Sequence, residues 1–201
     1  MFMEHNMKQT ILIFAMVLTM TSILLAQKVE NSSTFGVETD ILWPFFPGLT
    51  RTQATITLWQ DGDLKGDLLV GVNSFFPDDR ETEGRFSEYS IVTGYRQYLW
   101  QGLHVEFSQS TGMGVLDNHV TTGKSYKSYD WAVTGYIGYK FELAEFNPTS
   151  VIKSLYIIPQ FGVERVIYKS NPWPIYEDKT LTKEVGERPM MLGSLRFGCT
   201  F

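Results

Sequence analysis

The feature that most constrains this chain is an alternation of apolar and polar residues that returns eight times after residue 32. A period of two is the period of a β-strand, whose successive side chains point to opposite faces. The alternating segments are residues 35–43, 52–60, 68–75, 87–99, 103–110, 129–143, 155–167 and 189–201. No stretch of this region reads convincingly as a helix, so the sequence predicts an all-β fold of eight strands.

The connections between these segments alternate in length. Those after the second, fourth and sixth segments are short or moderate, at residues 61–67, 100–102 and 144–154, whereas residues 76–86, 111–127 and 168–188 form longer polar links. Short turns at one end and long loops at the other are the usual asymmetry of an antiparallel, up-and-down transmembrane barrel. Both ends of the barrel domain are then expected on the short-turn side.

Small residues indicate which face is the inner one. Glycines share the face of the charged residues in six segments, at Gly36, Gly71, Gly94, Gly138, Gly162 and Gly198. An eight-stranded barrel is only just wide enough to be filled by side chains, so this polar face is predicted to line the interior. Aromatic residues of the apolar face gather toward one rim at Trp43, Tyr89, Tyr129 and Trp131, and toward the other at Phe35, Tyr139, Phe141 and Phe201. Two aromatic girdles favour a membrane barrel over a soluble, lipocalin-like barrel.

The first residues predict export. Lys8 precedes an uncharged apolar run at residues 11–26, which is followed by polar Gln27 and Lys28. This order is typical of a cleaved secretory signal peptide, and the run is shorter than the roughly 20 residues of a spanning helix, although an uncleaved anchor is the alternative. We therefore expect a signal peptide at 1–26 and a barrel domain at 27–201.

The net charge of −5 argues against a nucleic-acid partner. The single cysteine excludes an intrachain disulfide and any cysteine-rich metal site, and no cofactor is predicted.

The last alternating segment, residues 189–201, resembles a strand of a known class of proteins. Leu195, Phe197 and Phe201 alternate with polar or small residues up to the terminal aromatic, which resembles the closing strand of bacterial outer-membrane proteins. The resemblance implies a location in the outer membrane of a Gram-negative bacterium, insertion by the barrel assembly machinery, and contact with outer-membrane lipids and lipopolysaccharide. Eight strands is the size of the OmpA membrane domain, OmpX and OmpW types, among which the pattern does not choose. A monomer is expected.

Parity, meaning whether a residue's position along its strand points it inward or outward, also predicts contacts inside the barrel. Leu99 and Leu103 are expected to pair across a three-residue turn that ends in a left-handed Gly102, which places Arg96 opposite Glu106 and Tyr98 opposite His104. We interpret Arg96–Glu106 as a structural ion pair that fills a narrow lumen, with a charged gate as the alternative. Inward charges are expected at Glu38, Asp40, Glu88, Glu106, Asp130, Glu142 and Glu164 against Arg96, Lys140 and Arg196. This count predicts an acidic lumen, which would favour cations if a path existed.

Three functions are compatible with these residues: a structural or binding role through the external loops, a narrow channel for small solutes or cations, and a lipid-modifying enzyme. His104 and Ser108 point inward, and no spacing in the 111–127 loop holds His119, Asp117 and Ser125 in a triad, so no enzyme is predicted.

Three further positions depart from the strand pattern or stand out in a loop. Arg165 is the one charge on the apolar face of its strand, where it could contact lipopolysaccharide phosphates or reach the headgroups without a specific partner. Pro159 predicts a bulge or pairing gap. Trp173, between two prolines in the 168–188 loop, is a candidate binding residue.

Overall fold

The structure is a computed structural model that describes residues 34–45, 49–80, 84–143, 154–170 and 189–201. These residues belong to one compact unit, Ser33–Phe201. The predicted signal peptide and Trp173 lie outside the described residues. Within the described ranges, no helix is long and apolar enough to cross a membrane.

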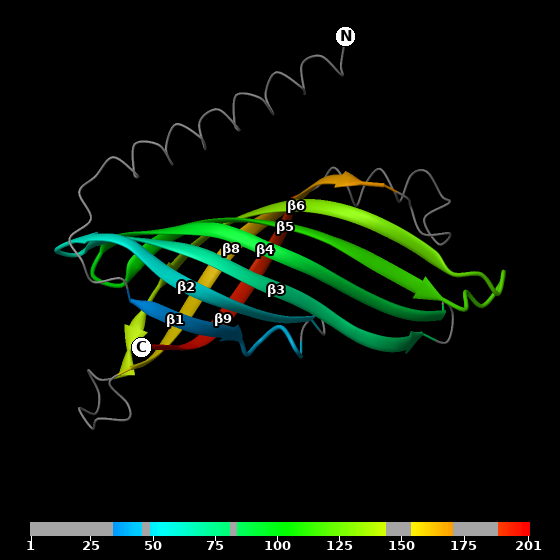
Figure 1. The fold of residues 1–201 in the computed structure, drawn as a ribbon, viewed down its shortest axis with the longest axis horizontal. Coiled ribbons are helices and arrows are strands. Elements are labelled where there is room, and N and C mark those ends of the chain that lie inside the picture. The colour runs from blue at the N-terminus through cyan, green and yellow to red at the C-terminus, as the bar shows by residue number, and fades with distance from the viewer. Residues whose placement is uncertain (1–33, 46–48, 81–83, 144–153, 171–188) are drawn as a thin grey trace, which may run out of the picture. The chain divides into compact units, whose positions relative to one another are not determined.

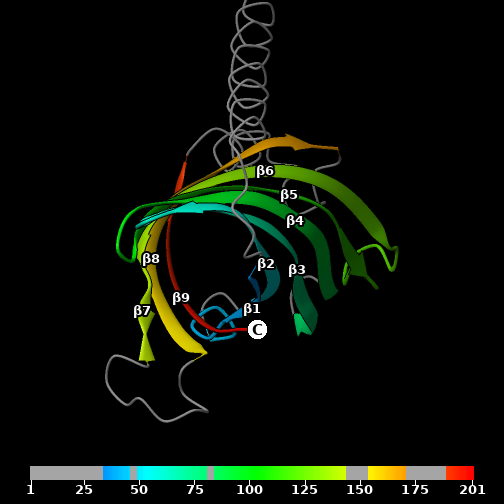
Figure 2. The same ribbon diagram turned by 60° about the vertical axis from the view of Figure 1, so that its left-hand side comes forward.

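Antiparallel strands make up almost all of this unit (Figure 1). They are β1 (Phe35–Asp40), β2 (Leu49–Asp61), β3 (Leu64–Arg80), β4 (Gly84–Trp100), β5 (Leu103–Asp117), β6 (Tyr126–Tyr139), β7 (Phe141–Glu142), β8 (Leu155–Lys169) and β9 (Met190–Thr200). Apart from β6 and β7, which both pair with β8, strands that follow each other along the chain are neighbours in the sheet. Strand β9 also pairs with β1, so the hydrogen bonding runs in a ring. Figure 2 shows the strands curving around a common axis. The predicted all-β, up-and-down architecture is confirmed.

Segment β7 continues β6. Gly138 of β6 is opposite Gln160, and Phe141 of β7 is opposite Ile157, so the register is the same on both sides of the interruption. Pro159 stands opposite the gap between them, and a proline has no amide hydrogen to give to the ladder. The predicted pairing gap is therefore present, and the nine segments form eight strands.

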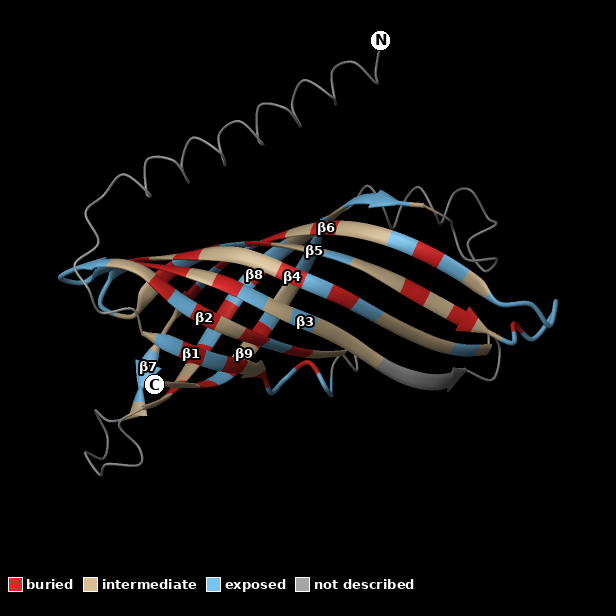
Figure 3. Ribbon diagram, viewed as in Figure 1, coloured by how far each residue is buried: buried red, intermediate tan, exposed pale blue. Residues whose placement is uncertain are grey.

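The two faces of the sheet differ in the way that parity predicts. Charged side chains are buried on six of the strands, at Glu38, Asp40, Arg51, Asp67, Arg96, Glu106 and Arg196. Large apolar side chains are exposed on the other face of every long strand, for example Val37, Ile56, Val72, Ile91, Phe107, Ile137, Val163 and Phe197. Figure 3 shows buried and exposed residues alternating along the strands. The interior also contains buried apolar residues, including Leu69, Val92 and Ile158, so it is mixed, whereas the large exposed residues of the outer face are mainly apolar.

Glycines on the inner face make room for aromatic rings from neighbouring strands. A Cβ atom added to Gly162 would overlap the ring of Tyr136, and one added to Gly198 would overlap the ring of Tyr156. Both tyrosines are buried. The assignment of the glycine-bearing face to the interior is thus confirmed.

The hairpin between β4 and β5 has the predicted register but a different turn. Arg96 is opposite Glu106 and Tyr98 is opposite His104, as expected, whereas Leu103 pairs with Trp100 and not with Leu99. The left-handed residue is Gln101, with φ of 47°, and not Gly102. A glycine is needed at 102 because a Cβ there would collide with the carbonyl oxygen of Lys140, whose amide donates to Gly102 O over 2.8 Å.

The predicted place of Trp43 in the outer aromatic girdle is wrong. Strand β1 ends at Asp40, whose Oδ1 accepts the backbone amides of Leu42 and Trp43 at 2.9 Å each. An aspartate that caps the amides following it turns the chain. The indole of Trp43 is buried and its Nε1 donates to Gly193 O over 2.8 Å, so the side chain folds inward.

Candidate functional site

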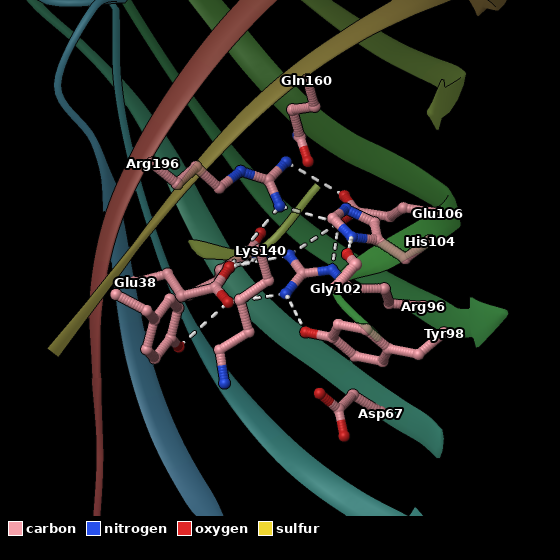
Figure 4. A network of polar contacts seen from close by, with 12 residues as sticks. Glu38, Asp67, Arg96, Tyr98, Gly102, His104, Glu106, Lys140, Gln160 and Arg196 are labelled. Atoms are coloured by element: carbon pink, nitrogen blue, oxygen red, sulfur yellow. Dashed lines mark hydrogen bonds and ion pairs between the residues drawn. The ribbon is translucent and has the colours of Figure 1, made fainter. Parts of the chain in front are cut away.

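Arg96 lies at the centre of the lumen and binds two carboxylates (Figure 4). Its Nε and Nη2 donate to Oε2 of Glu106 at 3.0 and 2.8 Å, and its Nη1 and Nη2 donate to the two carboxylate oxygens of Glu38 at 2.6 and 2.8 Å. The predicted Arg96–Glu106 pair is therefore present. The second partner, Glu38, comes from β1 across the lumen, which cross-strand register alone did not reveal.

Two further arginines complete this cluster. Arg196 of β9 donates to both oxygens of Glu106 at 2.8 and 3.0 Å. Arg51 of β2 lies 3.5 Å from Oε1 of Glu106 and donates to Ser108 and Gln53 at 3.3 and 3.0 Å. We call Glu38, Arg51, Arg96, Glu106 and Arg196 the ion layer; each is at most 3% exposed. Charges buried this deeply need partners, because their desolvation is otherwise unfavourable.

Neutral side chains use the remaining acceptor positions of the ion layer. Tyr156 and Gln53 donate to the two oxygens of Glu38 at 3.0 and 2.9 Å. The guanidinium of Arg196 lies 5.4 Å from the ring centroid of Tyr136, close enough for a cation–π contact. Every carboxylate oxygen of the layer thus has at least two donors or cations beside it, which is a geometry that fixes side chains in place.

Aromatic side chains lie on either side of the ion layer. The ring of Trp43 is 5.9 Å from the Arg51 guanidinium, while the hydroxyl of Tyr98 accepts from Arg96 Nη1 at 3.3 Å. Asp40, beside Trp43, also accepts from the hydroxyl of Ser194. The centre of the lumen is therefore filled by side chains from strands all around the ring.

The ion layer has more cations than anions, whereas the buried charges of the described lumen as a whole are acidic, as predicted, with Glu38, Asp40, Asp67 and Glu106 against Arg51, Arg96 and Arg196. Three arginines face two glutamates in the ion layer, because Arg51 shares the inward parity of Gln53 although the predicted strand began one residue later. Asp67, also outside its predicted strand, is buried too, whereas the side chain of Glu142 is 54% exposed. Parity gives the direction of a side chain but not its depth, and the predicted count treated all depths alike.

His104 and His119 each contact neighbouring groups of the fold. His104 is buried, as predicted, and its Nδ1 donates to Gly102 O at 3.0 Å. In the loop between β5 and β6, which is shorter than the predicted 111–127 link, the Nδ1 of His119 lies 3.2 Å from Thr122 Oγ1, and its ring packs edge-on against Tyr126 at 5.7 Å. These contacts hold the loop together and give His119 neighbours other than Asp117 and Ser125.

The remaining predicted site residues lie on the outer face. Arg165 is exposed on β8 opposite Val133. Phe197 and Phe201 are exposed and Leu195 is half-buried on the same side of β9. Phe201 continues the ladder, since its amide donates to Phe35 O at 2.8 Å, and the two rings lie 6.2 Å apart.

No three or more His, Cys, Asp or Glu side chains of the described ranges are grouped so as to hold a metal ion. Comparison with the models of known protein families, with characterised proteins and with solved structures yields no match.

Proposed function

We propose that this chain is an integral outer-membrane β-barrel protein whose role is structural or recognitional, with external loops as its binding part and a lumen closed by the ion layer. The observation that carries the proposal is the apolar outer face present on every long strand of a closed ring with charged residues inside. Only helices and closed barrels satisfy all backbone hydrogen bonds within lipid. In water the same surface would form an apolar belt far larger than the patches that monomeric proteins expose.

The strand lengths support a binding role at the long-loop end. Pairing between β3 and β4 extends to Arg80 and Gly84, while pairing between β2 and β3 stops at Leu49 and Phe75. Strands β3 to β6 therefore reach beyond the others at that end (Figure 1). In the proposed orientation this wall projects from the cell, with outer-membrane lipids around the belt and Arg165 positioned for a lipopolysaccharide phosphate.

Fractionation of cells that express the full chain tests the location. The proposal predicts that the shortened, signal-free protein sediments with outer membranes and resists extraction by alkaline carbonate. Recovery of the folded protein in a soluble fraction would favour the lipocalin-like alternative.

Measuring conductance in planar bilayers distinguishes a barrel with a closed lumen from the alternative, a narrow channel. With the ion layer at most 3% exposed, we expect no current through planar bilayers that hold the purified protein. Reproducible cation-selective steps would establish the channel instead.

A further inference from the structure

The register of the sheet determines how high each outer-face residue lies along the barrel axis. From Val37 of β1, paired residues lead in one direction to Arg165 of β8 and in the other to Leu155 of the same strand. The paired residues are Leu155, Cys199, Val37, Ala54, Val70, Thr93, Gln109, Val133 and Arg165. One circuit of the ring therefore advances along β8 from residue 155 to residue 165. At about 3.3 Å per residue and a strand tilt of about 40°, Arg165 lies about 25 Å above Leu155, which is the usual height of the apolar band of a membrane barrel.

Arg165 thus lies at the long-loop boundary of the apolar belt. Its side chain is exposed, and no carboxylate pairs with it within the described part of the chain. Trp131 lies two residues toward the long-loop end from Val133, the partner of Arg165, and Tyr89 lies four residues toward that end from Thr93. The same geometry places both aromatic residues within about 3 Å of the height of Arg165. Because Tyr and Trp gather where membrane hydrocarbon meets the headgroups, the proposed orientation puts Arg165 at headgroup level.

Three polar side chains continue from this level down into the belt. Trp131 Nε1 donates to Gln109 Oε1 over 3.3 Å, and Gln109 Nε2 donates to Thr93 Oγ1 over 3.2 Å. Each step back along the row of paired residues lowers the height by about 3 Å, so Gln109 and Thr93 lie about 6 and 9 Å below Arg165. Among the described residues, the second amide hydrogen of Gln109 and the hydroxyl hydrogen of Thr93 have no acceptor. Donors left without an acceptor are unfavourable in hydrocarbon, so these two need a polar partner there.

The outer face below Arg165 has room for a hydrocarbon chain. Phe107, Gly135 and Val163 are paired across three strands, in the next outward row below that of Arg165. Phe107 is 41% and Val163 43% exposed, and nothing lies within 4 Å of a Cβ added to Gly135. A glycine between two exposed apolar side chains lets a partner approach the backbone closely.

These features define the chemistry of the partner. An exposed guanidinium without a carboxylate suits a phosphate, which accepts two parallel hydrogen bonds. The donors of Gln109 and Thr93 suit carbonyl and hydroxyl oxygens several ångströms below that phosphate. In a glycerophospholipid the deepest polar groups are the ester carbonyls next to the glycerol, whereas amide-linked 3-hydroxyacyl chains have a hydroxyl further along the chain. An acyl chain of such a lipid would lie over Gly135.

We propose that the outer wall formed by β4, β5, β6 and β8 binds one phosphorylated glycolipid with hydroxyacyl chains. Arg165 binds its phosphate, Gln109 and Thr93 bind the amide and hydroxyl oxygens of an acyl chain, and Gly135 accommodates the hydrocarbon below them. This inference rests on the proposed function, because the site exists only if the outer face is in contact with lipid. It extends that function from a single arginine at headgroup level to a site that selects one class of lipid.

The experiment is a nuclear magnetic resonance titration of the full mature barrel in a neutral detergent, with the indole N–H signal of Trp131 as the readout. Lipid A, a phosphorylated and hydroxyacylated diglucosamine, is the probe, and lipid A without its phosphates forms the second arm. We expect a saturable shift, with binding at least about tenfold weaker in Arg165→Gln and also weaker in Gln109→Leu. Removing the phosphates should weaken binding to the wild type but not weaken it further in Arg165→Gln. Lys124→Gln, which removes the same charge from a long-loop position, is the control and should bind like the wild type.

Absence of a saturable shift with lipid A would overturn the proposal, and so would equal binding by the wild type and Arg165→Gln. Phosphatidylglycerol that binds as tightly as lipid A would overturn the assignment to a glycolipid. The two variants alter exposed and half-buried side chains on different strands, so one that fails to fold leaves the other as the test. Gel migration of the same samples before and after heating reports on the membrane barrel separately. Absence of binding with an intact heat shift therefore contradicts the lipid site and not the proposed function.

Discussion

Arg96 donates four hydrogen bonds to two buried carboxylates, which come from β1 and β5. An Arg96→Ala change leaves Glu38 with one fewer cation and the lumen with a void. We expect a loss of about 3–5 kcal/mol in the free energy of unfolding, as for other buried pairs deprived of one partner. Urea titration of the folded fraction in detergent measures it.

Arg165→Ala is the matched control, since it removes an arginine from the exposed outer face and should leave the urea midpoint almost unchanged. Equal midpoints for the two variants would show that the ion layer does not stabilise the barrel. New conductance in Arg96→Ala, with no loss of stability, would support the gate interpretation.

Inner-face glycines give a second prediction at this scale. In Gly162→Ala the new methyl group meets the ring of Tyr136, and we expect a destabilisation of about 1–3 kcal/mol from overpacking. Gly135→Ala, on the outer face with nothing within 4 Å of the added atom, should be neutral or slightly stabilising. Urea unfolding of both variants provides the comparison, and a reversed order would contradict the assignment of the two faces.

Contacts between residues could be predicted from the sequence where both residues belong to one hairpin. The pairing of Arg96 with Glu106 follows from parity in one hairpin. The contribution of Glu38 and Arg196 could not be predicted, because both reach Arg96 or Glu106 across the lumen from strands distant in sequence. The inward direction of Arg51 would have been predicted if the strand 52–60 had been extended by one residue.

Among the elements, the corner after β1 departs furthest from the sequence pattern. Alternation continues through Trp43, but the capping of two amides by Asp40 ends the strand and turns the indole into the lumen. A short polar side chain that competes with the sheet for backbone amides is a local signal, but alternation concealed it. The strands themselves were predictable because their period is local.

Trp43 variants test this corner. Trp43→Phe removes the hydrogen bond from Nε1 to Gly193 O and should cost about 0.5–1.5 kcal/mol. Trp43→Ala also removes a buried ring beside Arg51 and should cost about 3–5 kcal/mol. Thermal unfolding followed by near-ultraviolet circular dichroism measures both.

Trp100→Phe, which changes an exposed tryptophan at the β4–β5 turn, is the control. If Trp43→Ala were as stable as this control, the indole would not be buried in the folded protein.

At the scale of the whole molecule, two features act together: the closure of the sheet into a ring and the alternation of side chains between its two faces. Each strand sends charged or small residues to one side, and the β1–β9 pairing removes the free edges that would otherwise expose unpaired backbone. The ring thus encloses its charged residues and presents many large apolar ones, and the proposed membrane location rests on this arrangement.

The sequence predicted the ring from period and segment number. Two of the three long links it predicted, 76–86 and 111–127, are shorter, because β3 runs to Arg80, β4 begins at Gly84, β5 runs to Asp117 and β6 begins at Tyr126. The sequence could not predict the excess of arginine in the ion layer, which depends on the depth of each side chain.

Gel migration before and after heating distinguishes a closed membrane barrel from a soluble β-barrel. A membrane barrel closed by interstrand hydrogen bonds should remain folded in cold dodecyl sulfate, so unheated and boiled samples of the purified protein should migrate at different positions. We also expect the protein to stay dispersed only in detergent. Identical migration of the two samples, together with a folded protein that is soluble without detergent, would contradict both expectations.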